Sequence, residues 1–473
     1  MAITSSTTTA LDVPTLVSQL MAVERKPIDK LNTKVTDTQA KISSFGTLSS
    51  LVSSFQTAAK GLNPGLQKLA ATPSDASVFA ASASSTAVPG NYALTVSQLA
   101  QPQSLVAAGQ DSSTAAIGNG TATTVTFDLG AISGGTLTNG IYSGAAFTSN
   151  GSGTVSLTID SSNNTLEGIR DAINAAAPGV AATIVNDGSG TPYRLALSSS
   201  NSGTSNSFKI TTSGGDGTIN SLLGYDPAGT QNLTQTLAAQ DAKLTVNGIA
   251  ITSASNTVNE AIQGVTLTLK NTTAAPTSLS VARDTTAIET VASAFVDAYN
   301  ALAAQIKSRS AYGTSTSAGG SLAGDGTLRL MQDQLRSIFN SPASGGTLTS
   351  LAQVGIAFQK DGTLALDSSK LDSAIAANFS DVTNLFSSST GYATRLEAWA
   401  KSSLAAGGLI DTRTQSLNQY VKDRNADIDR LENQMTALQK RYTTEYTNLN
   451  MLLSSMNTTS TYLTQQLASS QSK

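Results

Sequence analysis

The sequence predicts an α+β multidomain protein, with a long N- and C-terminal α-helical coiled-coil leg, a helical-bundle domain with a β-hairpin, and inserted all-β head domains. Two observations carry this prediction. The last proline is Pro342 and the last glycine is Gly408, so the chain after Gly408 has no strong helix breaker. Between residues 75 and 284, by contrast, short β-type runs are separated by turns of Gly, Asn, Asp and Ser. Helical ends therefore flank a β-rich middle.

The N-terminal part of the chain predicts two amphipathic helices in succession. Asp12 can cap the first helix, whose opening turn tolerates Pro14. Pro27 should end or kink that helix, because an internal proline removes one hydrogen bond and clashes with the preceding turn. Beyond the break, the three/four spacing of apolar residues resumes. The apolar positions expected to make assembly or filament contacts here are Leu16, Leu20 and Val23 in the first helix and Leu31 and Val35 in the second.

The C-terminal part predicts one unbroken helix over residues 409–473, ~95 Å long at ~1.5 Å per residue. Its apolar residues alternate by four and three, which is the a/d seam of a coiled coil. Such a helix needs a partner along its length, and the N-terminal helices are the candidate. Three polar residues on the seam can set the register or face solvent: Arg424, Glu445 and Gln466. The expected contact residues are Leu431, Met435, Leu438, Tyr442, Leu449, Leu452, Met456 and Leu463.

The middle of the chain predicts β modules, interrupted once by a helical pattern at residues 165–174 that leads into a strand-like run at 180–185. Helical patterns return after Thr286, together with a hairpin that turns at Asp361 and Gly362. The predicted domains are residues 1–40 with 410–473 (coiled-coil leg), 41–75 with 285–409 (helical bundle), 76–110 with 236–284 (β head) and 111–235 (inserted β head).

The composition excludes most site chemistry. The 473 residues include neither histidine nor cysteine, so the chain cannot form disulfides, His bases or Cys/His metal sites. Charged residues make up 12% and the net charge is −3, which argues against nucleic acid. No apolar stretch reaches the ~18 residues of a membrane span. We therefore expect no catalytic, cofactor-binding or metal-ligating residues, no cofactor, no enzyme activity and no membrane insertion.

Two sets of carboxylate residues could be mistaken for catalytic or metal sites. Asp160, Glu167 and Asp171 could be imagined as a glycosidase pair, but their places at a strand end and on a short helix favour capping and surface roles. The acidic cluster of the C-terminal helix favours ion pairs with interleaved arginines over a metal site. That cluster consists of Asp423, Asp427 and Asp429. The only tryptophan, Trp399, lies on a helical pattern and is predicted to be core rather than a ligand platform.

Several segments carry a resemblance to a known family. They are residues 11–20 (Leu-Asp-Val-Pro-Thr-Leu-Val-Ser-Gln-Leu), the strand 264–269, the hairpin 355–367 and residues 456–467 (Met-Asn-Thr-Thr-Ser-Thr-Tyr-Leu-Thr-Gln-Gln-Leu). Together they resemble the flagellar hook-associated protein 2 family, the filament caps of bacterial flagella. The segment from residue 165 to 197 also resembles the IN motif shared by flagellar hook-associated proteins. The resemblance covers nearly the whole chain and is weakest at 110–235.

The resemblance implies a homo-oligomeric ring, usually a pentamer, at the distal tip of the flagellum. Such a cap retains exported flagellin and promotes its folding and insertion. The implied partners are further copies of the chain, flagellin, hook-associated junction proteins and an export chaperone, with mucin-type glycans as a further candidate. The sequence has no secretory signal at its start, which alone would suggest a cytoplasmic protein. Export without a cleaved signal peptide, which the family implies, would instead use residues 1–10.

Two alternatives remain open at this point. The first is an extracellular adhesin whose Ser/Thr-rich β head binds host glycans. The second is a hook–filament junction protein, which shares helical ends and β insertions but belongs to a continuous helical lattice. A cap should instead close into a ring.

Overall fold

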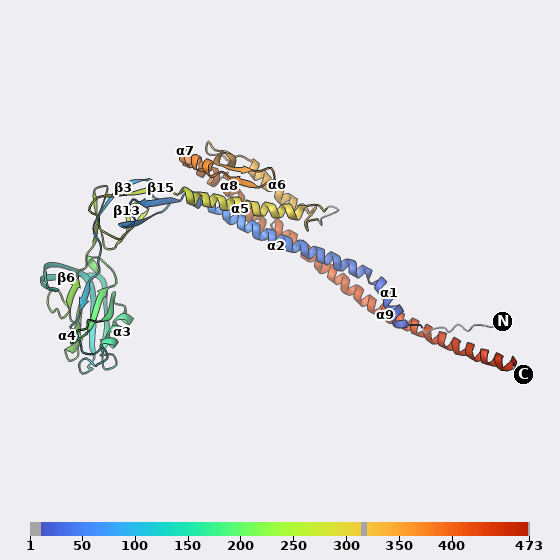
Figure 1. Ribbon diagram of the computed structural model, residues 1–473, viewed down its shortest axis with the longest axis horizontal. Helices are drawn as coiled ribbons and strands as arrows, with labels where there is room; N and C mark the ends of the chain where they lie inside the picture. The colour runs from blue at the N-terminus through green and yellow to red at the C-terminus, as the bar shows by residue number, and fades with distance from the viewer. Residues whose placement is uncertain (1–10, 314–318, 472–473) are drawn as a thin grey trace. The chain divides into compact units, whose positions relative to one another are not determined.

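The computed structural model describes residues 11–313 and 319–471 and divides into two units. The helical unit holds the chain up to Leu66 and from Thr285, and the β unit holds Gln67–Asp284. Figure 1 shows both units, with the β unit inserted between the two helical parts of the chain. The predicted order of helix, β insertion and helix is therefore confirmed.

The leg consists of α1 (Val13–Glu24), α2 (Lys26–Leu66) and α9 (Leu409–Gln471). α1 and α2 both lie against α9 (Figure 1). The predicted break near Pro27 is confirmed, since the helix is interrupted at Arg25. Pro27 then occupies the first turn of α2, where the missing N–H has no intrahelical partner to lose. The predicted unbroken C-terminal helix is α9, as far as Gln471.

The helical bundle is completed by α5 (Thr285–Ser310), α6 (Gly326–Asn340), α7 (Ser368–Ser387), α8 (Tyr392–Leu404), a 3-10 turn at Leu351–Val354 and the hairpin of β16 (Ile356–Phe358) and β17 (Leu364–Leu366). Aromatic rings pack together in its core: the ring centroid of Phe55 lies 5.6 Å from that of Phe295 and 6.4 Å from that of Trp399. Trp399 is 6% exposed, and its Nε1 donates to Gln334 Oε1 at 3.0 Å. The prediction that Trp399 belongs to the core is confirmed.

A part-buried ion pair joins α9 to α6 inside this unit. Asp325 caps α6 by accepting from Thr327 N at 2.9 Å and from Leu328 N at 3.4 Å. Its other oxygen, Oδ2, accepts from Arg413 Nε at 3.0 Å and Nη2 at 2.8 Å. The Asp325 side chain is 3% exposed and that of Arg413 is 34% exposed. One carboxylate therefore begins α6 and holds the start of the long helix against it.

The first β module consists of β1 (Leu69–Pro73), β2 (Phe79–Ala83), β3 (Gly90–Gln98), β11 (Ala242–Val246), β12 (Ile249–Ser253), β13 (Thr257–Ile262), β14 (Val265–Leu269) and β15 (Thr277–Arg283). These strands form two antiparallel sheets in the orders β1-β15-β3-β11-β12 and β13-β14-β2. Their alternating burial, as in the pattern of β14, encloses one core that includes Phe79, Leu244 and Leu267.

The second β module consists of β4 (Ser104–Val106), β5 (Thr123–Thr138), β6 (Ile141–Ile159), β7 (Val180–Asn186), β8 (Tyr193–Ser199), β9 (Ser207–Gly214) and β10 (Thr234–Leu237), with α3 (Leu166–Ala176), α4 (Thr218–Leu223) and a 3-10 turn at Thr204–Asn206. Its sheets have the orders β10-β4-β8-β7 and β6-β5-β9. α3 confirms the helix predicted at 165–174: Thr165 Oγ1 accepts from Gly168 N at 2.9 Å as its cap.

The structure divides the chain earlier than the sequence predicted at two points. The helical unit ends at Leu66 rather than near residue 75, because residues 69–73 form β1 and pair with β15. Leu105 and Ala107, expected in the first β module, belong to the core of the second. Strand pairing and core membership are non-local, so neither boundary has a signal in the local composition.

Candidate assembly surface

The contact between α1 and α9 begins with the capping of α1. Asp12 accepts hydrogen bonds from Thr15 Oγ1 at 2.6 Å and Thr15 N at 3.2 Å. The Thr15 hydroxyl, and then its backbone N–H, hold the pKa of Asp12 below its ordinary value. The buried face of α1 then packs against one stripe of α9. This α1–α9 seam consists of Val13, Val17 and Met21 on α1 and Met435, Leu438, Tyr442 and Tyr446 on α9.

The residues of α1 that pack within the chain are not the ones predicted to make assembly or filament contacts. Leu16 and Leu20 are half-buried, and Val23 is 59% exposed. The chain is interrupted between α1 and α2, so the buried face of α1 need not continue the apolar face of α2. Packing against α9 decides which side of α1 is buried. On α2, Val35 is buried and Leu31 is half-buried. The predicted residues of α1 thus flank the seam, where a second molecule can still reach them.

The seam of α9 also changes register. The predicted heptads hold from Leu417 to Tyr442, but the next half-buried positions are Tyr446 and Asn450 rather than Glu445 and Leu449. Asn450 Oδ1 accepts from Leu11 N at 3.0 Å, which fixes this end of the seam. A straight helix of 3.6 residues per turn drifts against a strict seven-residue repeat, and steps of four follow that drift.

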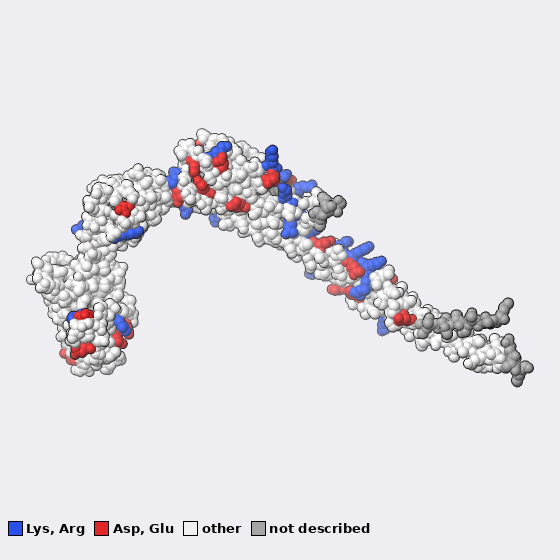
Figure 2. Space-filling model, in the orientation of Figure 1, with Lys and Arg blue, Asp and Glu red and all other residues white. Residues whose placement is uncertain are grey.

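Beyond Asn450, every residue of α9 from 451 to 470 is exposed. There is no charged residue between Glu445 and Lys473. Figure 2 shows this end of the helix without charge colour. The predicted contacts Leu449, Leu452, Met456 and Leu463 are 40%, 57%, 61% and 54% exposed, and the same stretch exposes Met451, Tyr462 and Leu467. We call residues 449–467 the apolar end of α9.

Ion pairs lie along α9 before the residues of the α1–α9 seam. Arg25, at the break between α1 and α2, pairs with Glu432 of α9. Arg424, one of the polar seam residues, is half-buried and pairs with Asp427 at 2.9 Å. Arg430 pairs with the same carboxylate at 3.0 Å. Within the acidic cluster, Asp427 has the ion pairs expected of such a helix face, and Asp423 accepts from Gln419 Nε2 at 2.8 Å. The other polar seam residues, Glu445 and Gln466, face solvent.

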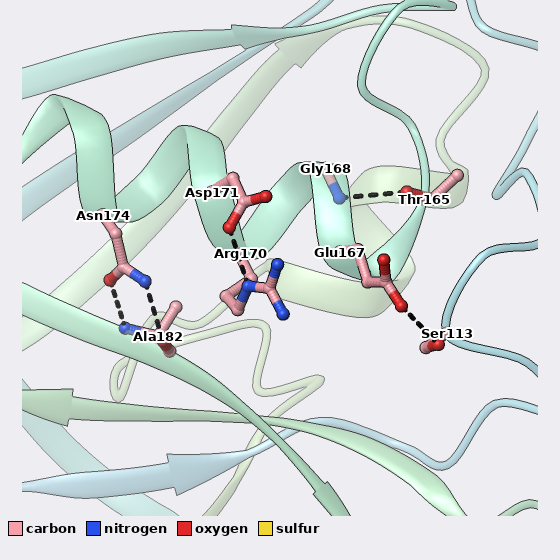
Figure 3. Close-up of polar contacts among 8 residues, drawn as sticks. All are labelled: Ser113, Thr165, Glu167, Gly168, Arg170, Asp171, Asn174 and Ala182. Carbon is pink, nitrogen blue, oxygen red and sulfur yellow. Dashed lines mark hydrogen bonds and ion pairs between the residues drawn. The ribbon is translucent and has the colours of Figure 1, made fainter.

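The three carboxylates considered above as a glycosidase pair, Asp160, Glu167 and Asp171, have structural partners. Ser113 Oγ donates to Glu167 Oε1 at 2.7 Å, and Arg170 Nε donates to Asp171 Oδ1 at 2.8 Å (Figure 3). Arg170 lowers the pKa of Asp171, and the Ser162 hydroxyl lowers that of Asp160. A general acid of a glycosidase needs a raised pKa. The capping and surface roles predicted for these residues are therefore what the contacts support.

Comparisons with known proteins agree with this layout. The family models described as "Flagellar hook-associated protein 2 N-terminus", "Flagellin hook IN motif" and "Flagellar hook-associated protein 2 C-terminus" match residues 9–103, 146–201 and 239–458. The flagellar hook-associated protein 2 of Escherichia coli strain K12 is 33% identical over 96% of both chains. The B-type flagellar hook-associated protein 2 of Pseudomonas aeruginosa is 33% identical over 97% of this chain and 96% of its own.

A solved structure is similar in fold as well. The crystal structure of the D1-D2-D3 domains of the flagellar cap protein FliD from Escherichia coli superposes with a TM-score of 0.67 at 32% identity. The match covers 79% of this chain and 99% of that one. Among the described residues, no helix combines the length and the apolar character that crossing a membrane requires.

Proposed function

Because the chain belongs to the flagellar hook-associated protein 2 family, we propose that it is a filament cap, a homo-oligomeric ring at the distal tip of the flagellum. The ring, a pentamer in this proposal, retains exported flagellin and promotes its folding and insertion as the filament elongates. The β unit forms the plate over the channel, and the leg reaches toward the filament. The relatives are named as flagellar hook-associated or cap proteins, which supports the tip location.

The observation that carries this proposal is the apolar end of α9. Burying one Leu or Met side chain is worth about 1.5–3 kcal/mol, so exposing Leu452, Met456 and Leu463 forgoes several kcal/mol in the isolated chain. Exposed apolar stripes of this kind mark interaction sites. The stripe has no charge that would require desolvation. We infer that further copies of the chain and the growing filament cover it, and that an export chaperone covers it before assembly.

The proposed route to the tip is export without a cleaved signal peptide. The segment expected to direct it, residues 1–10, lies outside the described residues. In this proposal, the cap first contacts the hook-associated junction proteins and later, once the filament grows, contacts flagellin instead. A tip position would also display the β unit to the surroundings, where it could bind mucin-type glycans.

The apolar end can be tested by substitution. L452Q/M456Q/L463Q should abolish filament elongation, because the stripe then carries three amides that must be desolvated on docking. S454Q/T458Q/T461Q, on the opposite face of the same helix, is the matched control and should leave elongation intact. Filament length is measured by electron microscopy in a strain that lacks its own cap. Deleting Leu449 to Lys473 should have the same effect while the β unit stays folded.

Normal filaments with either the triple glutamine variant or the deletion would contradict the cap proposal. The junction alternative makes a different prediction for the purified chain. A cap should form closed rings, visible by negative-stain microscopy and with a defined mass, whereas a junction protein should extend into an open lattice. Absence of rings at any concentration would favour the junction protein.

A further inference from the structure

The helical unit contains an open groove between α5, α6 and the hairpin of β16 and β17, which we call the α5–α6 groove. Its volume is about 710 Å³, and all three elements contribute to its lining. The lining residues extend from Tyr299 to Ser310 along α5 and from Gln332 to Asn340 along α6. These stretches are ~17 Å and ~12 Å long at ~1.5 Å per residue, so the groove has the length of about two to three helical turns.

Three aromatic rings line the groove together. The ring centroids of Tyr299 and Phe339 lie 5.1 Å apart, and that of Phe358 lies 5.8 Å from the first and 5.2 Å from the second. The three pairs meet edge to face, with interplanar angles of 78°, 80° and 89°. Phe358 is nevertheless 48% exposed. An aromatic side chain that is half open to water inside a concave surface has apolar area that a ligand can bury.

Hydrogen bonds hold the hairpin against α5, so the groove exists before a ligand arrives. Asn300 Nδ2 donates to Leu364 O at 2.9 Å, and Asn300 Oδ1 accepts from Leu364 N at 2.7 Å. The Tyr299 hydroxyl donates to Gly362 O at 3.2 Å. A site that is already formed loses less conformational freedom when it binds.

The rim of the groove has a net positive charge. Lys307 of α5 and Arg336 of α6 both line the groove, and both are exposed. The ion pair of Arg336 with Asp333 spans 4.0 Å between two exposed side chains, so it holds Arg336 only weakly. Asp361 also lines the groove, and its carboxylate accepts from Thr363 Oγ1 at 2.7 Å and Thr363 N at 3.0 Å. The charge of the rim therefore favours a ligand with carboxylates.

We propose that the α5–α6 groove binds an amphipathic helix of another polypeptide, one that presents apolar side chains to the aromatic rings and carboxylates to Lys307 and Arg336. Apolar residues at i, i+3, i+4 and i+7 form one face of a helix and span ~10 Å, which fits the length of the groove along α6. The apolar end of α9 from a second copy does not match this description, because it has no charged residue. The proposal does not rest on the filament-cap function.

Three peptides that carry the same rhodamine label separate the helix from its charge. The probe is (Glu-Leu-Ala-Gln-Leu-Leu-Ala)2 with blocked ends, in which the leucines form one helical face and the glutamates flank it. The second peptide has Lys in place of Glu. The third has Pro in place of the first Ala of each repeat, which breaks the helix. Each is titrated with the full-length chain, and binding is followed by anisotropy.

The unaltered chain should bind the glutamate peptide about tenfold more tightly than the lysine peptide, because two attractions replace two repulsions. The proline peptide should bind at least tenfold more weakly than the glutamate peptide, because it cannot present its leucines on one face. Equal binding of the glutamate and lysine peptides would overturn the proposal. A proline peptide that binds as tightly as the glutamate peptide would overturn it as well, since the ligand would then not be a helix.

Charge reversal locates the binding site. K307E/R336E should invert the preference, so that the lysine peptide binds more tightly than the glutamate peptide. The control is K60E/K401E, which reverses two exposed lysines of the helical unit that do not line the groove. This control should keep the preference of the unaltered chain. If both variants change the preference to the same extent, the peptides respond to the overall charge of the chain and the proposal is wrong.

Removal of one exposed apolar side chain tests the aromatic lining. F358A should weaken the binding of the glutamate peptide about tenfold, because it deletes the ring that the leucines cover. L330A is the matched control, since Leu330 of α6 is 45% exposed and does not line the groove. Unchanged binding by a folded F358A would contradict the proposal. If the fluorescence of Trp399 shows that F358A is unfolded, the charge reversal decides, because Lys307 and Arg336 are both exposed.

Discussion

Replacing Asp325 with alanine should destabilise the helical unit by about 2–4 kcal/mol. Loss of the cap on α6 costs about 1 kcal/mol, and loss of a charge-assisted bond to Arg413 costs about 1.5–3 kcal/mol. The penalty stays below that of a fully buried pair because the Arg413 side chain, 34% exposed, can turn toward water. D325N should cost less, since its amide oxygen can still cap α6.

Urea titration of the full chain, followed by the fluorescence of Trp399, measures this effect. Trp399 is the only tryptophan and lies in the helical core, so its signal reports the helical unit and not the β unit. With an m value of about 2 kcal/mol per molar urea, within the usual range of about 1–3, the midpoint should fall by about 1–2 M. D333A is the matched control, because Asp333 lies on the same helix and its side chain is 62% exposed. A change below about 0.5 kcal/mol for D325A, equal to that expected of a surface control, would refute the reasoning.

Two further predictions follow from the leg and the β unit. Y446A should increase amide hydrogen exchange in α1 while E445A leaves it unchanged, because Tyr446 packs in the α1–α9 seam and Glu445 faces solvent; equal effects would contradict the register. The Arg194 guanidinium lowers the pKa of Asp187 from 3.8 to about 2. A lowered folded-state pKa stabilises the fold above the unfolded-state pKa near 3.8, and this contribution disappears as the pH falls through about 2. NMR titration of the Asp187 carboxyl should give that midpoint, and R194M should move it back toward 3.8.

Much of the secondary structure is local in origin and could be predicted from the sequence. Gly408 is the last strong helix breaker in the sequence, and α9 begins at the next residue, Leu409. Pro27 places the break between the first two helices to within two residues, and Thr165 marks the start of α3. Breakers, caps and apolar periodicity act over a few residues, so one sequence contains them in full.

The face on which a helix packs could not be predicted from the sequence in the same way. Leu16 and Val17 are equally apolar neighbours, yet Val17 lies in the seam and Leu16 beside it. The four/three spacing predicted Leu449 in the seam, and the structure has Asn450 there. Adjacent apolar residues on a helix are separated by about 100°, so the position of the partner helix decides which one is buried.

By itself, the sequence determined the helical ends, the β insertion and the absence of His and Cys chemistry, because these depend on residue types and on spacings of a few residues. Only the tertiary structure decided which apolar residues of the leg remain uncovered and which side-chain amides bond to the backbone of a strand. Asn174 and Ala182 are eight residues apart, but Asn300 and Leu364 are 64 apart. An asparagine that bonds to the backbone of a strand looks the same in the sequence as one that faces water, because the difference lies in the backbone placed opposite its amide.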